Sequence, residues 1–298
     1  MMIRSLVIGD GLIGSALAEY LISTGAEVYR TTRREPLARS MLRLNLTDES
    51  QIEELLGDLK PLFNKGQITV FLTAAVTSYD RCEKDPIESR RINVTNSCLL
   101  VERLISQGAF VVLLSSSAVF SGDRFAAEDS ECDPQSVYGR QKADAERSIL
   151  KAMSACSSSG GVAIVRLSKV LTLKTPIISQ WRSSLKFGKA IEPFSDLRVS
   201  PISLSYAVKG LVAIGAARER GIFHLSGEAD VVYADIAREL ASRWGYSSRL
   251  INPVPCEQLT LNSFASPRIA SLSMSVTTNT FGLRPQSFKN LISELTES

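Results

Sequence analysis

The sequence predicts an α/β fold in which helices cover both faces of a doubly wound parallel sheet, followed by a smaller, irregular C-terminal lobe. Through the first half, short apolar β-type runs alternate with amphipathic segments of helical length, which is typical of parallel α/β proteins. Right-handed crossovers favour the doubly wound arrangement. Prolines interrupt the pattern after Leu167. We therefore expect a sheet domain over residues 1–168 and a lobe over 169–298, from which some segments return to the first domain.

Each expected strand is an apolar run bounded by turn or polar residues. These runs are Ser5–Gly9, Ala26–Thr31, Met41–Leu46, Thr69–Ala74, Ala109–Ser115 and Val162–Leu167. Each expected helix lies between two runs and repeats apolar residues at helical spacing. These segments are Ser15–Ser23, Glu49–Leu59, Ile87–Gln107 and Tyr138–Ser154. Seven prolines then punctuate shorter elements, at positions 176, 193, 201, 253, 255, 267 and 285.

Composition narrows the class of protein. The 298 residues carry a formal charge of +3, and the basic residues are spread along the chain, which argues against nucleic-acid binding. Five scattered cysteines form no metal or redox motif and suit free thiols in a reducing compartment. No signal peptide or membrane-length apolar stretch is apparent, so we expect a cytoplasmic protein with no membrane partner and no metal.

A glycine-rich turn follows the first expected strand and opens the first helix. Gly9, Gly11 and Gly14 have the G-x-G-x-x-G spacing, with Leu12 and Ile13 between the last two. Exposed N–H groups and the helix dipole at such a turn favour a pyrophosphate. The alternative is an ordinary strand-to-helix turn rich in glycine. With this strand and helix context, the motif predicts a Rossmann-type dinucleotide-binding domain.

Two arginines stand where the second expected strand ends. A site that prefers NAD places Asp or Glu about twenty residues after the glycine turn, to bind the ribose hydroxyls. This chain has Thr32, Arg33 and Arg34 there instead. Guanidinium groups suit the 2′-phosphate of NADP(H), so the sequence favours NADP(H) over NAD(H). A solvated basic loop is the alternative interpretation.

Three polar motifs in order along the chain predict carbonyl chemistry. Ser115-Ser116-Ser117 stands at the carboxyl end of a buried strand, the edge where ligands bind in open α/β sheets. Its hydroxyls can donate a hydrogen bond to a substrate carbonyl. Tyr138 and Lys142 lie four apart on one helix face, so Tyr138 would supply a proton while Lys142 lowers its pKa and holds the nicotinamide ribose. The alternative interpretation is structural: the serines form a polar end of the strand, and Tyr138 packs on a face of its helix.

Together these motifs resemble the extended short-chain dehydrogenases/reductases, and most specifically the dTDP-4-dehydrorhamnose reductase family, nearly from end to end. The segments that carry the resemblance are 73–83 (TAAVTSYDRCE), 92–94 (INV), 115–120 (SSSAVF), 223–227 (FHLSG) and 267–295. By this register, Ser116 takes the position of the catalytic hydroxyl, with Tyr138 and Lys142 as its two partners. The only histidine, His224, falls on a structural strand and is expected to be neither base nor ligand.

The resemblance implies an NADP(H)-dependent reductase of the 4-keto group of a nucleotide-activated deoxysugar. It adds cofactor contacts at Asn45, Leu46, Thr73, Ala74, Ala75 and Asn93. It implies substrate contacts at Val76, Thr77, Ser116, Ser117, Lys169 and Arg198, the last as a clamp for a substrate phosphate. A homodimer through the long helices is common in this superfamily.

Several residues depart from the family pattern. Ile8 stands where the family has its first glycine, so the turn follows the spacing of other dinucleotide-binding proteins. Asn45 replaces an aspartate. Residues 169–172 (KVLT) replace an aromatic strip that lines the substrate pocket, which changes the wall against which a sugar ring would stack. Two alternatives remain: a nucleotide-sugar epimerase or dehydratase of the same superfamily, and a non-catalytic nucleotide-binding regulatory protein.

Overall fold

The computed structural model describes residues 4–38, 40–63, 66–154, 160–256 and 267–297. The chain forms two compact units. Unit 1 comprises Met1–Phe120, Glu131–Arg166 and Val208–Phe223. Unit 2 comprises Ser121–Ser130, Leu167–Ala207 and His224–Ser298. Each unit is therefore built from segments that are distant in the sequence.

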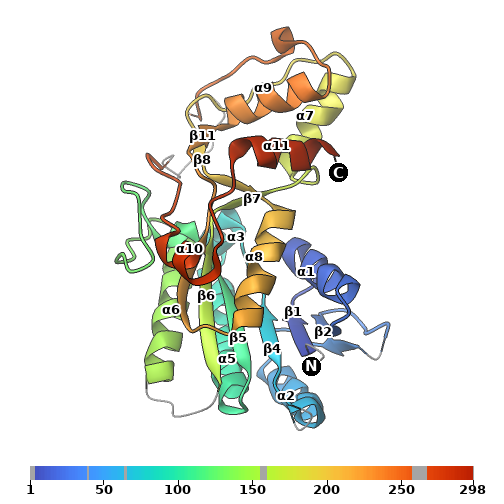
Figure 1. Ribbon diagram of the computed structural model, residues 1–298, viewed down its shortest axis with the longest axis vertical. Helices are drawn as coiled ribbons and strands as arrows, with labels where there is room; N and C mark the ends of the chain where they lie inside the picture. The colour runs from blue at the N-terminus through green and yellow to red at the C-terminus, as the bar shows by residue number, and fades with distance from the viewer. Residues whose placement is uncertain (1–3, 39, 64–65, 155–159, 257–266, 298) are drawn as a thin grey trace. The chain divides into compact units, whose positions relative to one another are not determined.

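A seven-stranded sheet forms the centre of unit 1 (Figure 1). Its order is β10-β6-β5-β4-β1-β2-β3, and the pairs from β5 to β3 are parallel. The strands are β1 (Arg4–Ile8), β2 (Glu27–Thr32), β3 (Met41–Arg43), β4 (Thr69–Leu72), β5 (Phe110–Ser116), β6 (Gly161–Leu167) and β10 (Gly221–Leu225). After β3 the chain returns across β1 to β4, which places the topological switch point between β1 and β4. This order confirms the predicted doubly wound sheet.

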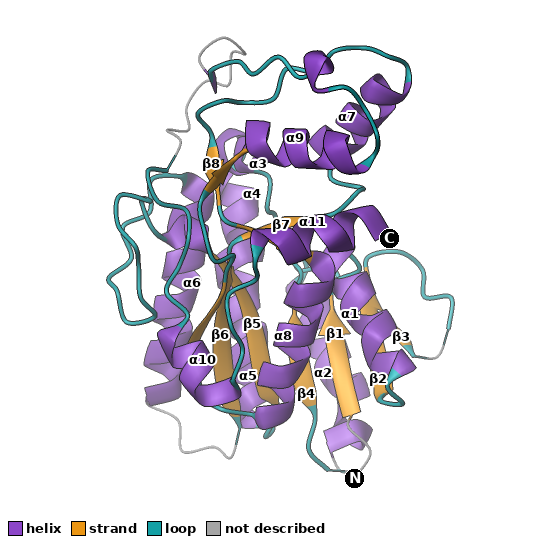
Figure 2. Ribbon diagram, turned by 45° about the horizontal axis from the view of Figure 1, so that its top comes forward, coloured by secondary structure: helices purple, strands orange, loops and turns teal. Residues whose placement is uncertain are grey.

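Helices cover both faces of this sheet, as Figure 2 shows. One face buries a large apolar cluster, in which strand residues such as Leu6 and Val70 pack with α2 (Glu49–Phe63), α5 (Ser97–Ser106) and α6 (Val137–Ser154). The other face carries α1 (Leu12–Ser23) and α8 (Leu204–Ala217). A methyl group added at Gly215 of α8 would lie 2.6 Å from the Phe71 ring, so glycine permits this close packing.

The helix expected over Ile87–Gln107 is confirmed, because the chain is helical without a break from Pro86 to Ser106, although the middle of this stretch is π-helical. The structure has α3 (Tyr79–Lys84), α4 (Pro86–Arg90), a π-helical turn (Arg91–Asn96) and then α5. Two buried asparagines explain the turn, because their side chains bond to distant loops. Asn93 Nδ2 donates to Val76 O at 2.9 Å, and Asn96 Nδ2 donates to Leu46 O at 2.7 Å. These contacts hold the chain where it changes its helical repeat.

Unit 2 is a smaller assembly with its own core, as expected of the irregular region after Leu167. Its strands form two short pairs: parallel β7 (Lys169–Leu171) with β9 (Pro201–Ser203), and antiparallel β8 (Arg198–Val199) with β11 (Val231–Val232). Its helices are α7 (Pro176–Lys186), α9 (Tyr233–Arg243), α10 (Ser275–Phe281) and α11 (Phe288–Glu297), with a short 3-10 turn at Ser248–Leu250. Trp181 and Phe194 pack edge-on against Tyr233 in this core.

His224 lies on β10 with a structural set of contacts. The side chain is fully buried, and its Nδ1 lies 2.7 Å from Ser273 O. Its backbone N–H donates to Thr277 Oγ1 at 2.9 Å. These partners support the expected structural role.

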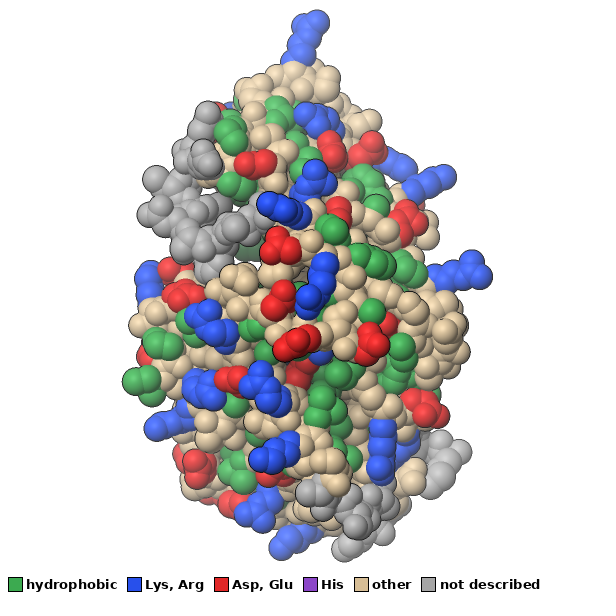
Figure 3. Space-filling view, turned by 90° about the vertical axis from the view of Figure 1, so that its left-hand side faces the viewer, with side chains coloured by type: hydrophobic (Ala, Val, Ile, Leu, Met, Phe, Trp, Pro, Cys, Tyr) green, Lys and Arg blue, Asp and Glu red, His purple; other side chains and the backbone are tan. Residues whose placement is uncertain are grey.

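The surface mixes charges of both signs. On the face drawn in Figure 3, Lys and Arg side chains are interleaved with Asp and Glu side chains. The four cysteines in the described part of the chain, Cys82, Cys98, Cys132 and Cys256, are free thiols. Among the described residues, no helix combines the length and the apolar character needed to cross a membrane.

A buried ion pair ties α6 to two strands of the sheet. Arg166 Nη2 lies 2.7 Å from Glu146 Oε2, and both side chains are only 3% exposed. Ser115 Oγ at the end of β5 donates to the same carboxylate. The Arg166 guanidinium also lies 4.9 Å above the centre of the Phe120 ring. Since both charged groups are removed from solvent, each is stabilised mainly by the opposite charge of its partner.

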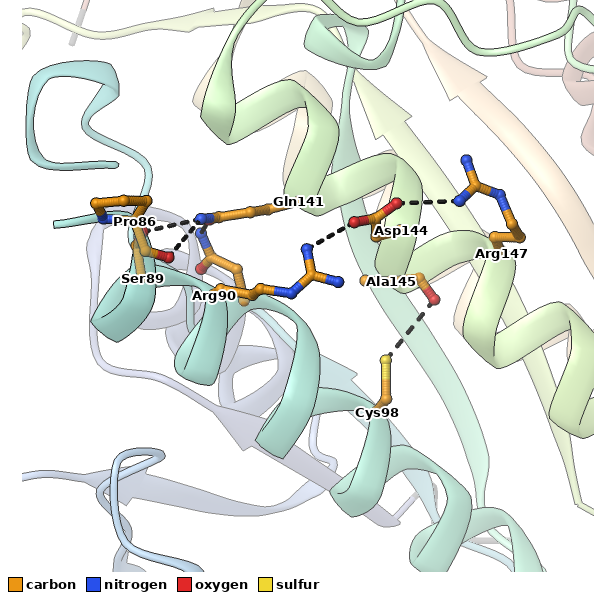
Figure 4. Close-up of polar contacts among 9 residues, drawn as sticks. Pro86, Ser89, Arg90, Cys98, Gln141, Asp144, Ala145 and Arg147 are labelled. Atoms are coloured by element: carbon orange, nitrogen blue, oxygen red, sulfur yellow. Dashed lines mark hydrogen bonds and ion pairs between the residues drawn. The ribbon is translucent and has the colours of Figure 1, made fainter. Parts of the chain in front are cut away.

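We predict that Glu146→Gln lowers the free energy of unfolding by about 3–5 kcal/mol, because it leaves the Arg166 charge buried without its counter-ion. Urea unfolding followed by circular dichroism measures this change. The matched control is Arg147→Gln on the same helix, where an exposed arginine pairs with Asp144 at 3.0 Å (Figure 4). The control should lose less than ~1 kcal/mol. Equal losses in the two variants would contradict the prediction.

Candidate active site

The glycine turn has the geometry of a cradle for a dinucleotide. Gly9 has φ of 109°, a conformation that disfavours side chains. A methyl group at Gly14 would lie 2.1 Å from Gly9 O, so the turn closes only with glycine there. A methyl group at Gly11, by contrast, would meet no atom within 4 Å. Gly11 therefore leaves the start of α1 open, where the N–H groups of Leu12, Ile13 and Gly14 suit a pyrophosphate. These residues fit the predicted cofactor.

Side chains at the switch point hold this turn in place. Thr73 Oγ1, just after β4, donates to Ile8 O at 2.9 Å, and Ala74 N–H donates to the same oxygen at 2.9 Å. Gly9 N–H donates to Thr31 Oγ1 at 3.0 Å. The carboxyl ends of β1, β2 and β4 thus form one fixed rim. Thr73 therefore holds the end of β1 in place. Ala75 lies in the loop after β4 and is partly exposed.

A close approach of two backbones brings Ser116 to Tyr138. Ser116 ends β5 and caps the short 3-10 turn Ser117–Val119, with its Oγ accepting from Ala118 N–H at 3.2 Å. A methyl group at Gly139 would lie 2.1 Å from Ala118 O, so α6 packs directly on this turn. A hydrogen bond from Ser116 is among the influences on the Tyr138 phenol. Ser116 and Tyr138 therefore lie close together in unit 1.

Lys142 is buried one turn further along α6. Its Nζ donates to Leu114 O at 2.5 Å, and the residue is 5% exposed. Burial lowers the pKa of Lys142 to about 8, while the Glu146 carboxylate opposes that shift. The ammonium group is thus fixed against the strand that carries Ser116.

The expected lowering of the Tyr138 pKa by Lys142 is wrong for this structure. Burial is the largest influence and raises the pKa of the phenol. The neighbouring Tyr79, whose ring centre lies 5.3 Å away, raises it further, and the hydrogen bond with Ser116 lowers it. The phenol consequently keeps its proton at neutral pH, which is the state that a proton donor needs.

Several predicted contacts have structural partners. Asn93 is 2% exposed; its Oδ1 accepts from Val76 N–H at 2.8 Å and its Nδ2 donates to Gln141 Oε1 at 2.9 Å. Gln141 in turn donates to Ser89 and Pro86 (Figure 4). Asn93 therefore shapes the loop after β4, and both polar atoms of its side chain bond to protein groups.

The remaining predicted residues of unit 1 come shortly after the carboxyl ends of β3, β4 and β5. Asn45 Oδ1 accepts from Thr47 N–H at 3.2 Å, and Leu46 is buried in the apolar cluster. Thr77 is exposed, and Ser117 is partly exposed. Lys169 and Arg198 belong to unit 2, where they begin β7 and β8, and both are exposed.

Arg33 and Arg34 line an open pocket of about 510 Å³ together with Asp10 and Gly11. Asp10 was not predicted as a site residue. Its Oδ2 accepts from Thr32 Oγ1 at 2.8 Å, although the two residues are 22 apart in the sequence. Sequence spacing alone carries no signal for this contact, since it depends on the register of β1 with β2.

The chain matches the family described as RmlD substrate binding domain over residues 3–298. Among curated relatives, it is 26% identical to methionine adenosyltransferase 2 subunit beta of Xenopus laevis, over 72% of this chain and 64% of that protein. It is 25% identical to dTDP-4-dehydrorhamnose reductase of Mycobacterium tuberculosis, over 76% of this chain and 72% of that protein.

Two solved structures share the fold. The dTDP-4-dehydrorhamnose reductase of Bacillus anthracis in complex with NADP has a TM-score of 0.84 at 20% identity, covering 99% of both chains. MoeE5 in complex with UDP-glucose and NAD has a TM-score of 0.79 at 22% identity, covering 99% of this chain and 97% of the other.

These comparisons support the predicted class of enzyme, an oxidoreductase, and the two solved structures share its predicted fold. They also confirm the predicted resemblance to the dTDP-4-dehydrorhamnose reductase family. The chain belongs to the RmlD family of extended short-chain dehydrogenases/reductases, matched from residue 3 to residue 298.

Proposed function

We propose that the protein is an NADP(H)-dependent reductase of the 4-keto group of a nucleotide-activated deoxysugar, with Tyr138 as the proton donor. The observation that carries this proposal is the meeting of Ser116 with Tyr138 at the end of β5, supported by the close packing of Gly139 on the turn below. Lys142 completes the set on the same helix. Family membership supports the substrate class.

The residues divide the work of carbonyl reduction. When bound, the nicotinamide supplies a hydride to the carbonyl carbon. Ser116 donates a hydrogen bond to the carbonyl oxygen and stabilises the charge that develops there. Tyr138 transfers its phenolic proton to that oxygen. Lys142, whose ammonium group is fixed on Leu114 O, would hold the ribose of the nicotinamide.

Arg33 and Arg34 support the preference for NADP(H). Both line the open pocket beside Gly11, and both are exposed. A 2′-phosphate there would form charge-assisted hydrogen bonds with the two guanidinium groups. In unit 2, we propose that Arg198 binds a phosphate of the nucleotide sugar and that Lys169 contacts the sugar, where the family has an aromatic wall.

A second candidate function is a non-catalytic regulatory subunit. The relation to methionine adenosyltransferase 2 subunit beta favours it. The retained Ser116, Tyr138 and Lys142 argue against it, because a purely regulatory subunit needs no proton donor. An epimerase or dehydratase of the same superfamily is a closer variant, which would retain its cofactor through purification and show no net cofactor turnover.

The decisive assay incubates the purified protein with NADPH and a panel of keto-sugar nucleotides that includes dTDP-4-dehydrorhamnose. Oxidation of NADPH that depends on one of these sugars supports the reductase. Stoichiometric cofactor already present in the purified protein, with no net oxidation, would indicate the epimerase or dehydratase. Binding of cofactor without conversion of any sugar would indicate the regulatory protein.

We predict that Tyr138→Phe lowers kcat by about 10²- to 10⁴-fold, because the variant keeps the ring and loses the transferable proton. Stopped-flow or steady-state oxidation of NADPH measures the loss, and calorimetry checks that cofactor binding persists. Tyr79→Phe is the matched control, since it removes a phenolic hydroxyl from the neighbouring ring. The control should keep most of the rate, and full activity of Tyr138→Phe would refute the assignment.

The pH dependence should report Lys142. Its folded-state pKa is lowered to about 8, so the ammonium form prevails below that pH and disappears above it. Because burial raises the pKa of Tyr138, the phenol keeps its proton over this range. We therefore expect kcat/KM, which reports the free enzyme, to fall as the pH rises through about 8. A profile that stays flat from neutral pH into the alkaline range would show that the Lys142 charge is not required.

A further inference from the structure

We propose that Asp10 is a specificity-determining residue that enables the site to accept NAD(H) alongside NADP(H). This inference rests on the proposed function, because it takes a nicotinamide dinucleotide as the ligand. It adds a residue from the glycine turn that opposes the preference set by Arg33 and Arg34.

In sites that prefer NAD, an acidic side chain at the end of the second strand accepts hydrogen bonds from the adenosine ribose hydroxyls. Here β2 ends at Thr32, which carries no charge and is only 3% exposed. By sequence the acid is missing. In the structure it is supplied from the first turn, because Thr32 Oγ1 donates to Asp10 Oδ2 at 2.8 Å.

Hydrogen bonds hold both the backbone and the side chain of Asp10. Its backbone carbonyl accepts from Ser15 Oγ at 3.0 Å, in the first turn of α1. The hydroxyl that holds its carboxylate also accepts from Arg34 N–H at 3.1 Å. One buried threonine thus couples the carboxylate of Asp10 to the backbone of the arginine segment.

Asp10 and the two arginines line the same open pocket of about 510 Å³. The residue is exposed, so its second carboxylate oxygen, Oδ1, can accept from a ligand hydroxyl. A ribose 2′-hydroxyl offers such a donor, whereas a 2′-phosphate brings negative charge close to the carboxylate. The arginines have the opposite effect on the two ligands. The pocket therefore combines one element that favours each cofactor.

Binding of NADH and NADPH to the purified protein, measured by calorimetry, tests the inference without any sugar substrate. Asp10→Asn keeps the shape of the side chain and removes its charge. We expect it to weaken NADH by about tenfold, the usual cost of losing a hydrogen bond to a charged group. NADPH should bind equally well or more tightly, since the opposing charge is gone.

Two further variants separate the contributions. Arg34→Gln should weaken NADPH by about tenfold and leave NADH nearly unchanged, because only the phosphate needs the guanidinium. Thr32→Val retains the Asp10 charge and removes the hydroxyl that holds it, so it should weaken NADH less than Asp10→Asn does. Asp58→Asn on α2 removes one exposed carboxylate from unit 1 and serves as the control for net charge.

An equal loss of both cofactors in Asp10→Asn would overturn the inference, since it would show that Asp10 only maintains the turn. An unchanged ratio of the two affinities would also overturn it. Neither result touches the proposed reduction, which depends on Tyr138. Conversely, full turnover by Tyr138→Phe would remove the proposed function and leave a shifted NADH to NADPH ratio intact. Binding of neither cofactor by the unmodified protein would overturn both.

Discussion

The ion pair between Glu146 and Arg166 is the interaction on which the region around Ser116 and Lys142 depends. It joins α6 to β6 directly and to β5 through Ser115, and its two side chains are almost completely removed from solvent. Ser116 follows Ser115, and Lys142 lies one helical turn before Glu146. The same carboxylate that fixes the serine therefore also makes a buried ammonium group tolerable, because it opposes the effect of burial on Lys142.

The glycine turn after β1 depends on a second constraint, which is steric. A side chain on Gly9 would collide with Thr73 and Ala74, and one on Gly14 would collide with Gly9 O, so neither fits without moving the turn. Thr73 also bonds across to the end of β1. Gly11 serves a different purpose, since a side chain there would project into open space. The three glycines of one motif thus divide into two that close the turn and one that leaves room beside the helix terminus.

Much of the fold followed from the sequence because parallel sheets leave a simple pattern. The apolar runs at 69–74 and 109–115 matched β4 and β5 within two residues at each end, since such strands are buried on both faces. The helix expected over Ile87–Gln107 also formed, but its π-helical middle was not predicted, because there Asn93 and Asn96 bond to loops far away in the sequence. The same distance effect hid Asp10. Likewise, spacing placed Lys142 near Tyr138 without revealing that burial dominates the pKa of the phenol.

The division into two units bears on how such proteins diverge. The contacts described for Ser116, Tyr138 and Lys142 come from unit 1, whereas residues 169–172, where the sequence departs from its family, belong to unit 2. Substitutions that accumulate in β7 leave these three residues and the Glu146–Arg166 ion pair unchanged. After gene duplication, substitutions can therefore accumulate in β7 of one copy while natural selection conserves the residues of unit 1.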